Sequence, residues 1–312
     1  MNWSARDIPN QSGRIAVVTG ANSGLGLETA RQLARRGAHV VMAARNLDKA
    51  AAACDDIRAK VPTASLEIEQ LDLASLASIG GFAARLLANH PRLDLLFNNA
   101  GVMATPQGST ADGFEMQFGT NHLGHFALTA LLAPALVRTP GGRVVLTTST
   151  GRFFAGSYDL SNPHLRGRYT TWEAYGISKR ANLQFALELD RRLRAAGSPA
   201  RALVADPGFS QTELQARSVR ESGGASQRFF HIVVAAAGQS AGRGALPLLR
   251  EGTDPAAEGG TLYRPRWVWG GTPVVGKIGP GLRPPDQLLR LWEVSEADTK
   301  ITFDVTGAVG DN

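Results

Sequence analysis

The hydrophobic and polar positions of this chain follow two periods in turn, which predict alternating strands and helices. Short apolar or strictly alternating runs, rich in β-branched residues, are typical of strands. Six such runs occur, namely Ile15–Val18, His39–Ala44, Ser65–Leu71, Leu93–Asn98, Gly142–Thr148 and Ala200–Ala205. The first five are each followed by a stretch of helical period, at Leu27–Ala34, Leu47–Val61, Ser75–Ala88, Phe114–Leu136 and Trp172–Ala195.

This alternation predicts a doubly wound α/β fold, with one parallel sheet of about seven strands and helices on both of its faces. Farther along, Gln239–Arg250 has a helical pattern, Thr261–Tyr263 would be a last short strand, and Asp286–Glu296 a terminal helix. We expect a single domain over residues 1–312, with a lid insertion at about 208–240 and a C-terminal extension at about 266–312.

The first strand runs into a glycine-rich turn. Ile15–Gly26 reads IAVVTGANSGLG and carries glycines at 20, 24 and 26. Glycine allows positive φ and close approach of the backbone to a pyrophosphate, while a helix start presents free N–H groups and a positive dipole end. The order of strand, glycines and helix predicts a dinucleotide phosphate site, although the spacing differs from the common GxGxxG pattern. This stretch alone leaves a plain strand–helix turn open as the alternative.

The composition is that of an ordinary globular protein, with 43% hydrophobic and 19% charged residues. The single cysteine, Cys54, excludes an intramolecular disulfide and fits a reducing compartment. We find no leader pattern at the N-terminus, and the longest apolar run, Phe229–Ala237, is too short to span a bilayer. We therefore expect a cytoplasmic protein. The net charge of +6 comes from scattered arginines rather than a concentrated stripe, which disfavours nucleic acid as a partner.

Three side chains suggest acid–base chemistry at one edge of the sheet. Tyr175 and Lys179 lie four residues apart and share a helix face. An ammonium beside a phenol would lower the pKa of the phenol, as a general acid/base near neutrality requires. Ser149 follows a predicted strand and could hold a carbonyl oxygen for Tyr175. Each feature alone also fits an ordinary structural role, as a snorkelling surface lysine or a satisfied loop hydroxyl.

Further short motifs complete a recognisable pattern. In chain order they are Thr19-Gly-x-x-x-Gly-x-Gly26, Asn98-Asn-Ala-Gly101, Asn121, Ser149, Tyr175-x-x-x-Lys179 and Pro207-Gly208. This set resembles the short-chain dehydrogenase/reductase family over about residues 14–265. The segments Asn121-His122-Leu-Gly-His125-Phe126 and Ser178-Lys179-x-x-Asn182 resemble most the branch of retinol dehydrogenases and WW-domain oxidoreductases.

The resemblance implies a Rossmann fold and an oxidoreductase that moves a hydride between nicotinamide and a carbonyl or alcohol carbon. Tyr175 would donate and accept the proton, and Ser149 would orient the substrate oxygen. Lys179 would lower the pKa of Tyr175 and hold the nicotinamide ribose, and Asn121 would hold a water that links Lys179 to solvent. The implied cofactor contacts are Gly20, Asn22, Ser23, Gly24, Leu25, Gly26, Arg45, Asp72, Leu73, Asn99, Ala100, Gly101, Tyr175, Lys179, Pro207, Gly208 and Thr212.

The end of the second strand bears on the choice of cofactor. A site that prefers NAD usually offers an acidic residue there, hydrogen-bonded to the ribose 2′-hydroxyl. Here Arg45 and Asn46 follow the strand, and no carboxylate occurs before Asp48. A guanidinium suits a 2′-phosphate through charge-assisted hydrogen bonds, so we expect NADP(H) to be preferred and NAD(H) to be possible. The alternative is that Arg45 is only a surface charge at a helix start.

Two histidines raise the question of a metal site. His122 and His125 lie three residues apart on one predicted helix, but no Cys, Asp or Glu stands at a fitting third position nearby. A zinc site needs three or four ligands. Packing roles are therefore favoured for both histidines, and no metal is expected.

Two segments bear on the substrate. Asp206 stands where many relatives have Asn or His, which would change the polarity beside the nicotinamide. Apolar side chains that follow Ser149 or Pro207 are Phe153, Phe154, Tyr158, Phe209, Phe229, Phe230, Ile232, Val233 and Val234. If they line one cleft, the substrate is a bulky apolar carbonyl or alcohol. Packing of these side chains onto the core is the alternative.

Two classes of function therefore stand. One is an NADP(H)-dependent carbonyl reductase or alcohol dehydrogenase acting on a lipophilic small molecule, as a monomer or a homo-oligomer. The other is a non-catalytic dinucleotide sensor or interaction protein on the same fold. Sensors of this fold typically lose the tyrosine or the lysine, so the joint presence of Asn121, Ser149, Tyr175 and Lys179 favours the enzyme. An epimerase or dehydratase of the extended branch would need a larger C-terminal domain than residues 266–312 provide.

Overall fold

One eight-stranded sheet organises the computed structural model, which describes residues 2–211, 224, 232 and 238–306. Its strands are β1 (Ile15–Thr19), β2 (His39–Ala44), β3 (Ser65–Gln70), β4 (Leu95–Asn98), β5 (Arg143–Thr147), β6 (Arg201–Ala205), β7 (Leu262–Trp267) and β8 (Gly270–Gly276). They lie in the order β3-β2-β1-β4-β5-β6-β7-β8. The first seven pair in parallel and β8 pairs antiparallel with β7, which confirms the predicted doubly wound α/β fold.

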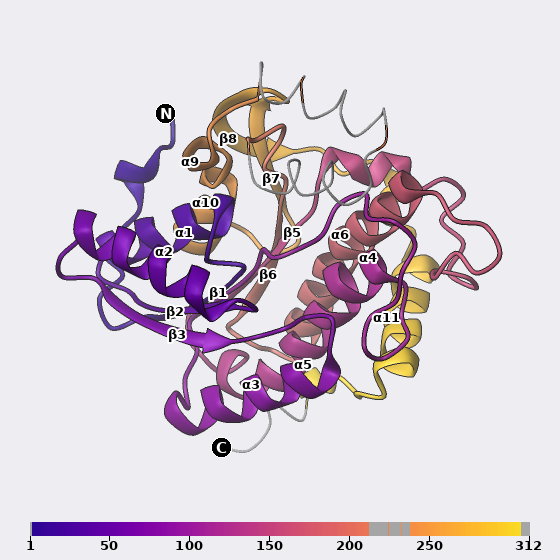
Figure 1. The fold of residues 1–312 in the computed structure, drawn as a ribbon, viewed down its shortest axis with the longest axis horizontal. Coiled ribbons are helices and arrows are strands. Elements are labelled where there is room, and N and C mark those ends of the chain that lie inside the picture. Colours follow the sequence, from indigo (N-terminus) through magenta and orange to yellow (C-terminus); the bar gives the residue numbers. More distant parts are fainter. Residues whose placement is uncertain (1, 212–223, 225–231, 233–237, 307–312) are drawn as a thin grey trace.

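Helices cover both faces of the sheet (Figure 1). The α-helices are α1 (Gly24–Arg35), α2 (Leu47–Lys60), α3 (Leu76–Asn89), α4 (Met116–Phe118), α5 (Gly124–Leu136), α6 (Thr171–Ala195), α9 (Ala241–Gly244), α10 (Leu246–Thr253) and α11 (Pro285–Thr299). Short 3₁₀ turns are η1 (Ala5–Asp7), η3 (Thr150–Phe154) and η4 (Pro280–Leu282), and η2 (Gly119–Leu123) is π-helical. One layer holds α1, α2 and α10; the other holds α3, α5 and α6, with α11 packed against α6.

The strand β1 shows why the central runs are apolar throughout. Val17 belongs to the apolar cluster beneath α3, α5 and α6, whereas its neighbours Ala16 and Val18 belong to the cluster beneath α1, α2 and α10. All three side chains are fully buried. Successive strand residues point to opposite faces, so a strand covered on both sides needs apolar residues at every position.

The eighth strand, β8, departs from the expected sheet of about seven strands. It falls in the predicted C-terminal extension and forms a hairpin with β7, whose beginning matches the predicted strand Thr261–Tyr263. The seven residues of β8, GGTPVVG, include three glycines and a proline, which lowers the strand propensity of this segment. An antiparallel edge strand tolerates such residues, because one of its sides forms no ladder.

One helix prediction also needs correction, and the start of another helix differs from its sequence pattern. The continuous helix expected at Phe114–Leu136 is divided into α4, the π-helical turn η2 and α5. At the start of α6, the spacing Thr170-x-x-Glu173 has the form of a capping box, yet the Thr170 hydroxyl donates to the Glu173 carboxylate (Oγ1–Oε2, 3.3 Å) and not to the backbone. Among the helices that the structure describes, none is long and apolar enough to cross a membrane.

Candidate functional site

A cavity of about 600 Å³ opens where six neighbouring strands end. Its walls come from the carboxyl ends of β1 to β6 and from the first turns of the helices that follow, which is where open α/β sheets bind ligands. The predicted site residues that line it are Gly20, Asn22, Ser23, Gly24, Leu25, Arg45, Asp72, Leu73, Asn99, Ala100, Gly101, Ser149, Tyr175, Lys179, Pro207 and Gly208. Gly26 and Asn121 lie behind this wall, and Thr212 lies outside the described residues.

The glycine turn after β1 is shaped so that backbone faces the cavity. Gly20 has a φ of +67°, which a side chain would strain. A Cβ on Gly26 would lie 2.3 Å from the carbonyl oxygen of Gly20, so only glycine lets α1 pack this closely. Ser23, the N-cap of α1, makes no side-chain capping bond. The first N–H groups of α1 are therefore left for an anionic ligand.

Thr19, the last residue of β1, joins the ends of β1 and β4. Its Oγ1 accepts hydrogen bonds from the backbone N–H groups of Asn99 and Ala100, both at 2.9 Å. The Asn99 side-chain amide in turn donates to the Thr19 carbonyl at 2.9 Å. The side chain of Asn99 thus ties two strand ends together, while the backbone at 99–101 forms the cavity wall. Sequence reasoning treated Thr19 only as part of a motif and missed this role.

Tyr175 reaches the cavity from α6 and meets Ser149 there. Its ring is almost fully buried, and a Cβ on Gly151 would lie 2.5 Å from the ring carbon Cε1. A hydrogen bond joins the side chains of Tyr175 and Ser149. The Ser149 hydroxyl also accepts a hydrogen bond from the backbone N–H of Gly151 at 3.1 Å. The structure therefore brings the predicted serine and tyrosine together at one end of the cavity.

Lys179 lies one turn beyond Tyr175, with its Nζ 5.8 Å from the centre of the tyrosine ring. This Nζ donates to the carbonyl oxygen of Thr147 at 3.3 Å. Burial lowers the pKa of Lys179 to about 8 and raises the pKa of Tyr175 to about 12. The shift of the Tyr175 pKa thus runs opposite to the predicted lowering, because the loss of hydration and the charge of Asp206 outweigh the hydrogen bond with Ser149.

The side chain of Asn121, in the π-helical turn η2, forms three hydrogen bonds within the protein. Its Oδ1 accepts from the Val102 N–H at 2.7 Å, and its Nδ2 donates to the Val102 carbonyl and to the Ser178 hydroxyl, both at 2.9 Å. Asn121 therefore fixes the segment after β4 against α6, one residue from Lys179. The water that the resemblance assigns to Asn121 stays a prediction.

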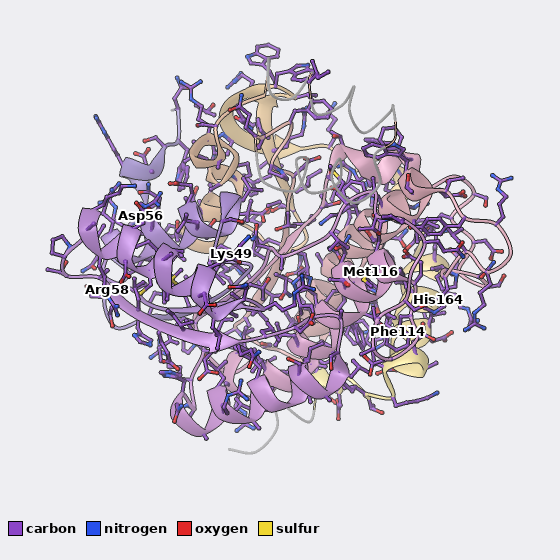
Figure 2. The ribbon with its side chains drawn as sticks, in the orientation of Figure 1. Lys49, Asp56, Arg58, Phe114, Met116 and His164 are labelled. Atoms are coloured by element: carbon purple, nitrogen blue, oxygen red, sulfur yellow. The ribbon has the colours of Figure 1, made fainter. Side chains whose placement is uncertain are left out.

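The opposite end of the cavity is basic. Arg45 is exposed at the end of β2 and lines the cavity. Lys49 lines the cavity as well, from α2, where Figure 2 labels it. Asn46 caps α2 by accepting the Lys49 N–H at 2.8 Å, which fixes the first turn of that helix. Sequence reasoning missed Lys49, although its spacing of four residues from Arg45 was the available signal.

Apolar side chains surround the tyrosine end. Met103, Phe154, Trp172 and Phe209 all line the cavity, which supports the predicted cleft for Phe154 and Phe209. Three other predicted apolar residues that the structure describes, Tyr158, Phe153 and Ile232, do not line the cavity. Tyr158 is buried in a separate cluster with Phe118 and Leu123, and Phe153 is exposed. Ile232 is exposed as well, and Phe229, Phe230, Val233 and Val234 lie outside the described residues.

The two histidines near Asn121 are buried parts of the framework. His125 Nε2 lies 3.0 Å from Thr19 Oγ1, and its Nδ1 lies 2.9 Å from the Asn121 carbonyl oxygen. His122 Nε2 lies 2.8 Å from the Ser295 hydroxyl of α11. In the part of the chain that the structure describes, neither histidine belongs to a cluster of three metal-ligating groups.

Fold and cavity together define an α/β protein with a nucleotide-type site at the carboxyl edge of a doubly wound sheet. The family model for short chain dehydrogenases matches residues 14–223. The chain therefore belongs to the short-chain dehydrogenase family, and its similarities place it in the retinol-dehydrogenase-like branch, as its motifs predicted. The family comprises oxidoreductases that bind a nicotinamide dinucleotide.

Named relatives support this placement. Retinol dehydrogenase 13 of Homo sapiens is 45% identical over 65% of this chain and 60% of its own length. Polyprenol dehydrogenase of Mus musculus is 46% identical over 66% of this chain and 63% of its own length. The chain thus spans less than two thirds of these relatives. Retinol dehydrogenase 12 of Homo sapiens is 37% identical over 91% of this chain and 85% of its own length.

A solved structure extends the similarity to nearly the whole chain. The crystal structure of an uncharacterized protein from Mycobacterium Paratuberculosis has 39% sequence identity and a TM-score of 0.79, and the match covers 97% of this chain and 100% of that one. A protein from Beutenbergia cavernae that is described as an NAD(P)-dependent gluconate 5-dehydrogenase, with NADP bound at low occupancy, has 25% identity and a TM-score of 0.64, over 82% of this chain and 96% of that one.

Proposed function

We propose that this protein is an NADP(H)-dependent oxidoreductase that acts on a carbonyl or alcohol carbon of a lipophilic small molecule, with Tyr175 as general acid/base. The observation that carries the proposal is the arrangement of one cavity. Its glycine turn and basic wall lie at one end, and Ser149, Tyr175 and Lys179 lie at the other. A dinucleotide laid along the strand ends would bring its nicotinamide to the tyrosine end.

The cofactor preference rests on charge at the end of β2. Arg45 and Lys49 both face the space where the adenosine ribose of a dinucleotide lies in this fold, and the nearby Asp48 does not line the cavity. Two cations favour a 2′-phosphate, whereas a free 2′-hydroxyl is best held by a carboxylate. We therefore propose NADP(H) as the preferred cofactor.

The substrate class rests on the apolar end. Met103, Phe154, Trp172 and Phe209 surround the entrance to Tyr175, and such walls favour apolar ligands. The relatives named retinol and polyprenol dehydrogenases act, by those names, on lipophilic alcohols.

The proposal also covers the organisation of the chain. We propose a single domain over residues 1–312, with a lid at about 208–240 that completes the apolar end of the cavity. We also propose that the protein is cytoplasmic.

The side chains divide the chemistry between them. When bound, the nicotinamide supplies or accepts the hydride. Ser149 would hold the substrate oxygen by a hydrogen bond, next to the Tyr175 hydroxyl. Because burial raises its pKa to about 12, Tyr175 carries its proton at neutral pH and is ready to donate it to an oxygen that gains charge. The Lys179 ammonium, one helical turn away, would stabilise the phenolate that remains.

The direct test is a turnover screen with purified protein. NADPH oxidation would be followed against retinoid aldehydes, aliphatic aldehydes and ketones, steroids and quinones, with NADH in parallel. We expect turnover with at least one lipophilic carbonyl compound, faster with NADPH than with NADH. Binding of NADPH without turnover of any class would instead support the dinucleotide sensor, the second class of function on this fold.

A further inference from the structure

Three metal-ligating side chains meet at the edge of the sheet that faces away from the cavity. His39 is the first residue of β2, Glu67 lies in the neighbouring β3, and His90 caps the C-terminus of α3. His39 lies six residues before Arg45 along β2, which at the rise of an extended strand is roughly 20 Å from the cavity. The cluster therefore belongs to a different part of the molecule than the oxidoreductase site.

The three side chains converge on one point. Glu67 Oε2 lies 3.1 Å from His39 Nε2 and 2.8 Å from His90 Nε2. One ligand atom from each residue lies within 4.8 Å of the other two. The centres of the two imidazole rings are 5.3 Å apart. In the part of the chain that the structure describes, this is the only group of three such residues.

These distances are close to those of an occupied zinc site. Tetrahedral ligands at about 2.0–2.1 Å from zinc lie about 3.3 Å from one another. To bind zinc, the distances from Glu67 Oε2 to the two histidine Nε2 atoms would need to increase by only a few tenths of an ångström. The two imidazole rings would need to move slightly closer to each other. The side chains are 30%, 26% and 15% exposed for His39, Glu67 and His90, so an ion can enter and water can complete the coordination.

A neighbouring hydroxyl orients one imidazole of the cluster. The Ser65 hydroxyl lies 2.8 Å from His39 Nδ1, so the other ring nitrogen, Nε2, is the one turned toward Glu67. Glu67 Oε2 in turn lies within hydrogen-bond distance of the Nε2 atoms of both His39 and His90. The three prospective ligand atoms therefore already face one another.

We propose that His39, Glu67 and His90 form a binding site for a divalent transition-metal ion of the zinc class. Two imidazole nitrogens and one carboxylate oxygen match zinc, whereas calcium and magnesium prefer oxygen ligands. The ion would join β2, β3 and the end of α3, elements that no disulfide connects. Its role would be to stabilise the fold, since it lies at the edge opposite the cavity.

This proposal departs from the expectation of no metal, which weighed only His122 and His125. The ligands here are separated by 28 and 23 residues in sequence, from His39 to Glu67 and from Glu67 to His90. No local spacing pattern marks them. Only the parallel pairing of β2 with β3 and the return of α3 bring them together.

The test uses the full chain without an affinity tag, freed of metal by a chelator and then titrated with zinc chloride. We expect one zinc ion per chain by calorimetry. At a hundredfold excess of zinc over Kd, we expect a rise in Tm of about 5 °C, which EDTA reverses. The oxidoreductase turnover should stay within about twofold, because the site is remote.

Variants decide whether these three residues are the ligands. His90→Gln and Glu67→Gln should each weaken zinc binding at least tenfold, with the shift in Tm lost. Two variants serve as controls. Glu69→Gln removes a carboxylate that lies two residues after Glu67 on β3. His164→Gln removes a histidine that pairs with Asp298 and lies beside Phe114, far from α2 (Figure 2). Both controls should bind zinc as the unchanged chain does.

Two outcomes would overturn the proposal. One is the absence of a stoichiometric zinc ion in the unchanged chain; the cluster would then be a hydrogen-bonded His–carboxylate–His group only. The other is zinc binding of equal strength in folded His90→Gln and Glu67→Gln, which would place the ion elsewhere. Circular dichroism of each variant before titration keeps a folding defect from being mistaken for a lost ligand.

Discussion

The Arg152 guanidinium forms a buried ion pair with the Asp206 carboxylate, at 2.5 Å between Nη1 and Oδ2. The same Nη1 donates to the Ser149 carbonyl at 2.7 Å, and Asp206 Oδ1 accepts the Gly208 N–H at 2.9 Å. The pair thus ties the turn after β5, which carries Ser149, to the turn after β6. The ion pair also explains how a buried carboxylate is accommodated beside the cavity.

We predict that Arg152→Met destabilises the fold by about 3–5 kcal/mol, because the buried Asp206 would lose its ion-pair partner. Urea unfolding of the unchanged chain and the variant measures this difference. The double variant Arg152→Met with Asp206→Asn should recover most of the loss, since no charge is then left unpaired. Losses that simply add in the double variant would show that the pair is not coupled.

We predict that Tyr175→Phe retains NADPH binding but lowers kcat by at least about 10²–10⁴-fold, the usual contribution of a positioned acid/base. The phenyl ring still fills the space beside Gly151, so the cavity keeps its shape. Turnover with the best substrate of the screen, and fluorescence titration with NADPH, separate the two effects.

The matched control for this variant is Tyr158→Phe. Tyr158 is also buried, but it lies in a different apolar cluster and its hydroxyl has no hydrogen-bond partner among the described residues. Losing that hydroxyl should leave kcat unchanged. Near-normal turnover in Tyr175→Phe would rule out the proposed mechanism, and an equal loss in both variants would point to a general packing defect.

What the sequence could predict here is largely what local chemistry determines. The strand, glycine turn and helix start at Ile15–Gly26 follow one another in the chain, so their geometry follows from neighbouring residues. The ion pair between Arg152 and Asp206 could not be predicted in this way. Arg152 lies 54 residues before Asp206, and the two meet only because β5 pairs with β6. Thr19, which accepts from residues 80 and 81 positions later, is a second such case.

Burial was the other quantity that the sequence could not supply. A spacing of four residues correctly placed Tyr175 and Lys179 on one face of α6, but the direction of the Tyr175 pKa shift depends on how much water reaches the ring. That depends on Met103, Ala104 and Trp172, which pack around the ring from other positions in the chain. Residue spacing thus predicts which groups meet, and packing decides their protonation.

We predict that Arg45→Asp lowers kcat/KM for NADPH by about 10–100-fold and raises it for NADH, because a charge-assisted pair contributes about 1.5–3 kcal/mol. Lys49→Ala should lower kcat/KM for NADPH less, by about threefold to tenfold. The lysine ammonium is a point charge, whereas the guanidinium of Arg45 can form two parallel hydrogen bonds to a phosphate. Steady-state kinetics with both cofactors measures the change in preference.

Arg58→Ala is the control for this pair, because Arg58 is an exposed cation on the same helix, α2, but does not line the cavity (Figure 2). Its removal alters the net charge of the chain without altering the site. The NADPH to NADH ratio should stay constant in this variant. If the NADPH to NADH ratio is unchanged in Arg45→Asp as well, the residues at the end of β2 do not recognise the 2′-phosphate.

The last prediction concerns His122, which lies among the rings of Phe118, Phe126 and Phe185. Burial lowers the pKa of His122 to about 3 from an ordinary value of 6.5. Above pH 6.5 the histidine is neutral in both the folded and the unfolded chain and contributes no pH dependence. Between about 6.5 and 3 the unfolded chain binds a proton that the folded chain does not, so stability falls as the pH falls.

We predict that this one proton changes the free energy of unfolding by about 1.4 kcal/mol per pH unit near pH 5, and that His122→Gln removes that slope. Other buried groups also titrate, among them His125, whose pKa burial lowers to about 4, and Glu251, whose pKa burial raises. The difference between the unchanged chain and His122→Gln isolates His122 from both. Urea unfolding at pH 7.5, 6.0 and 5.0 gives the two slopes, and parallel curves would show that His122 takes up its proton equally in the folded and unfolded chain.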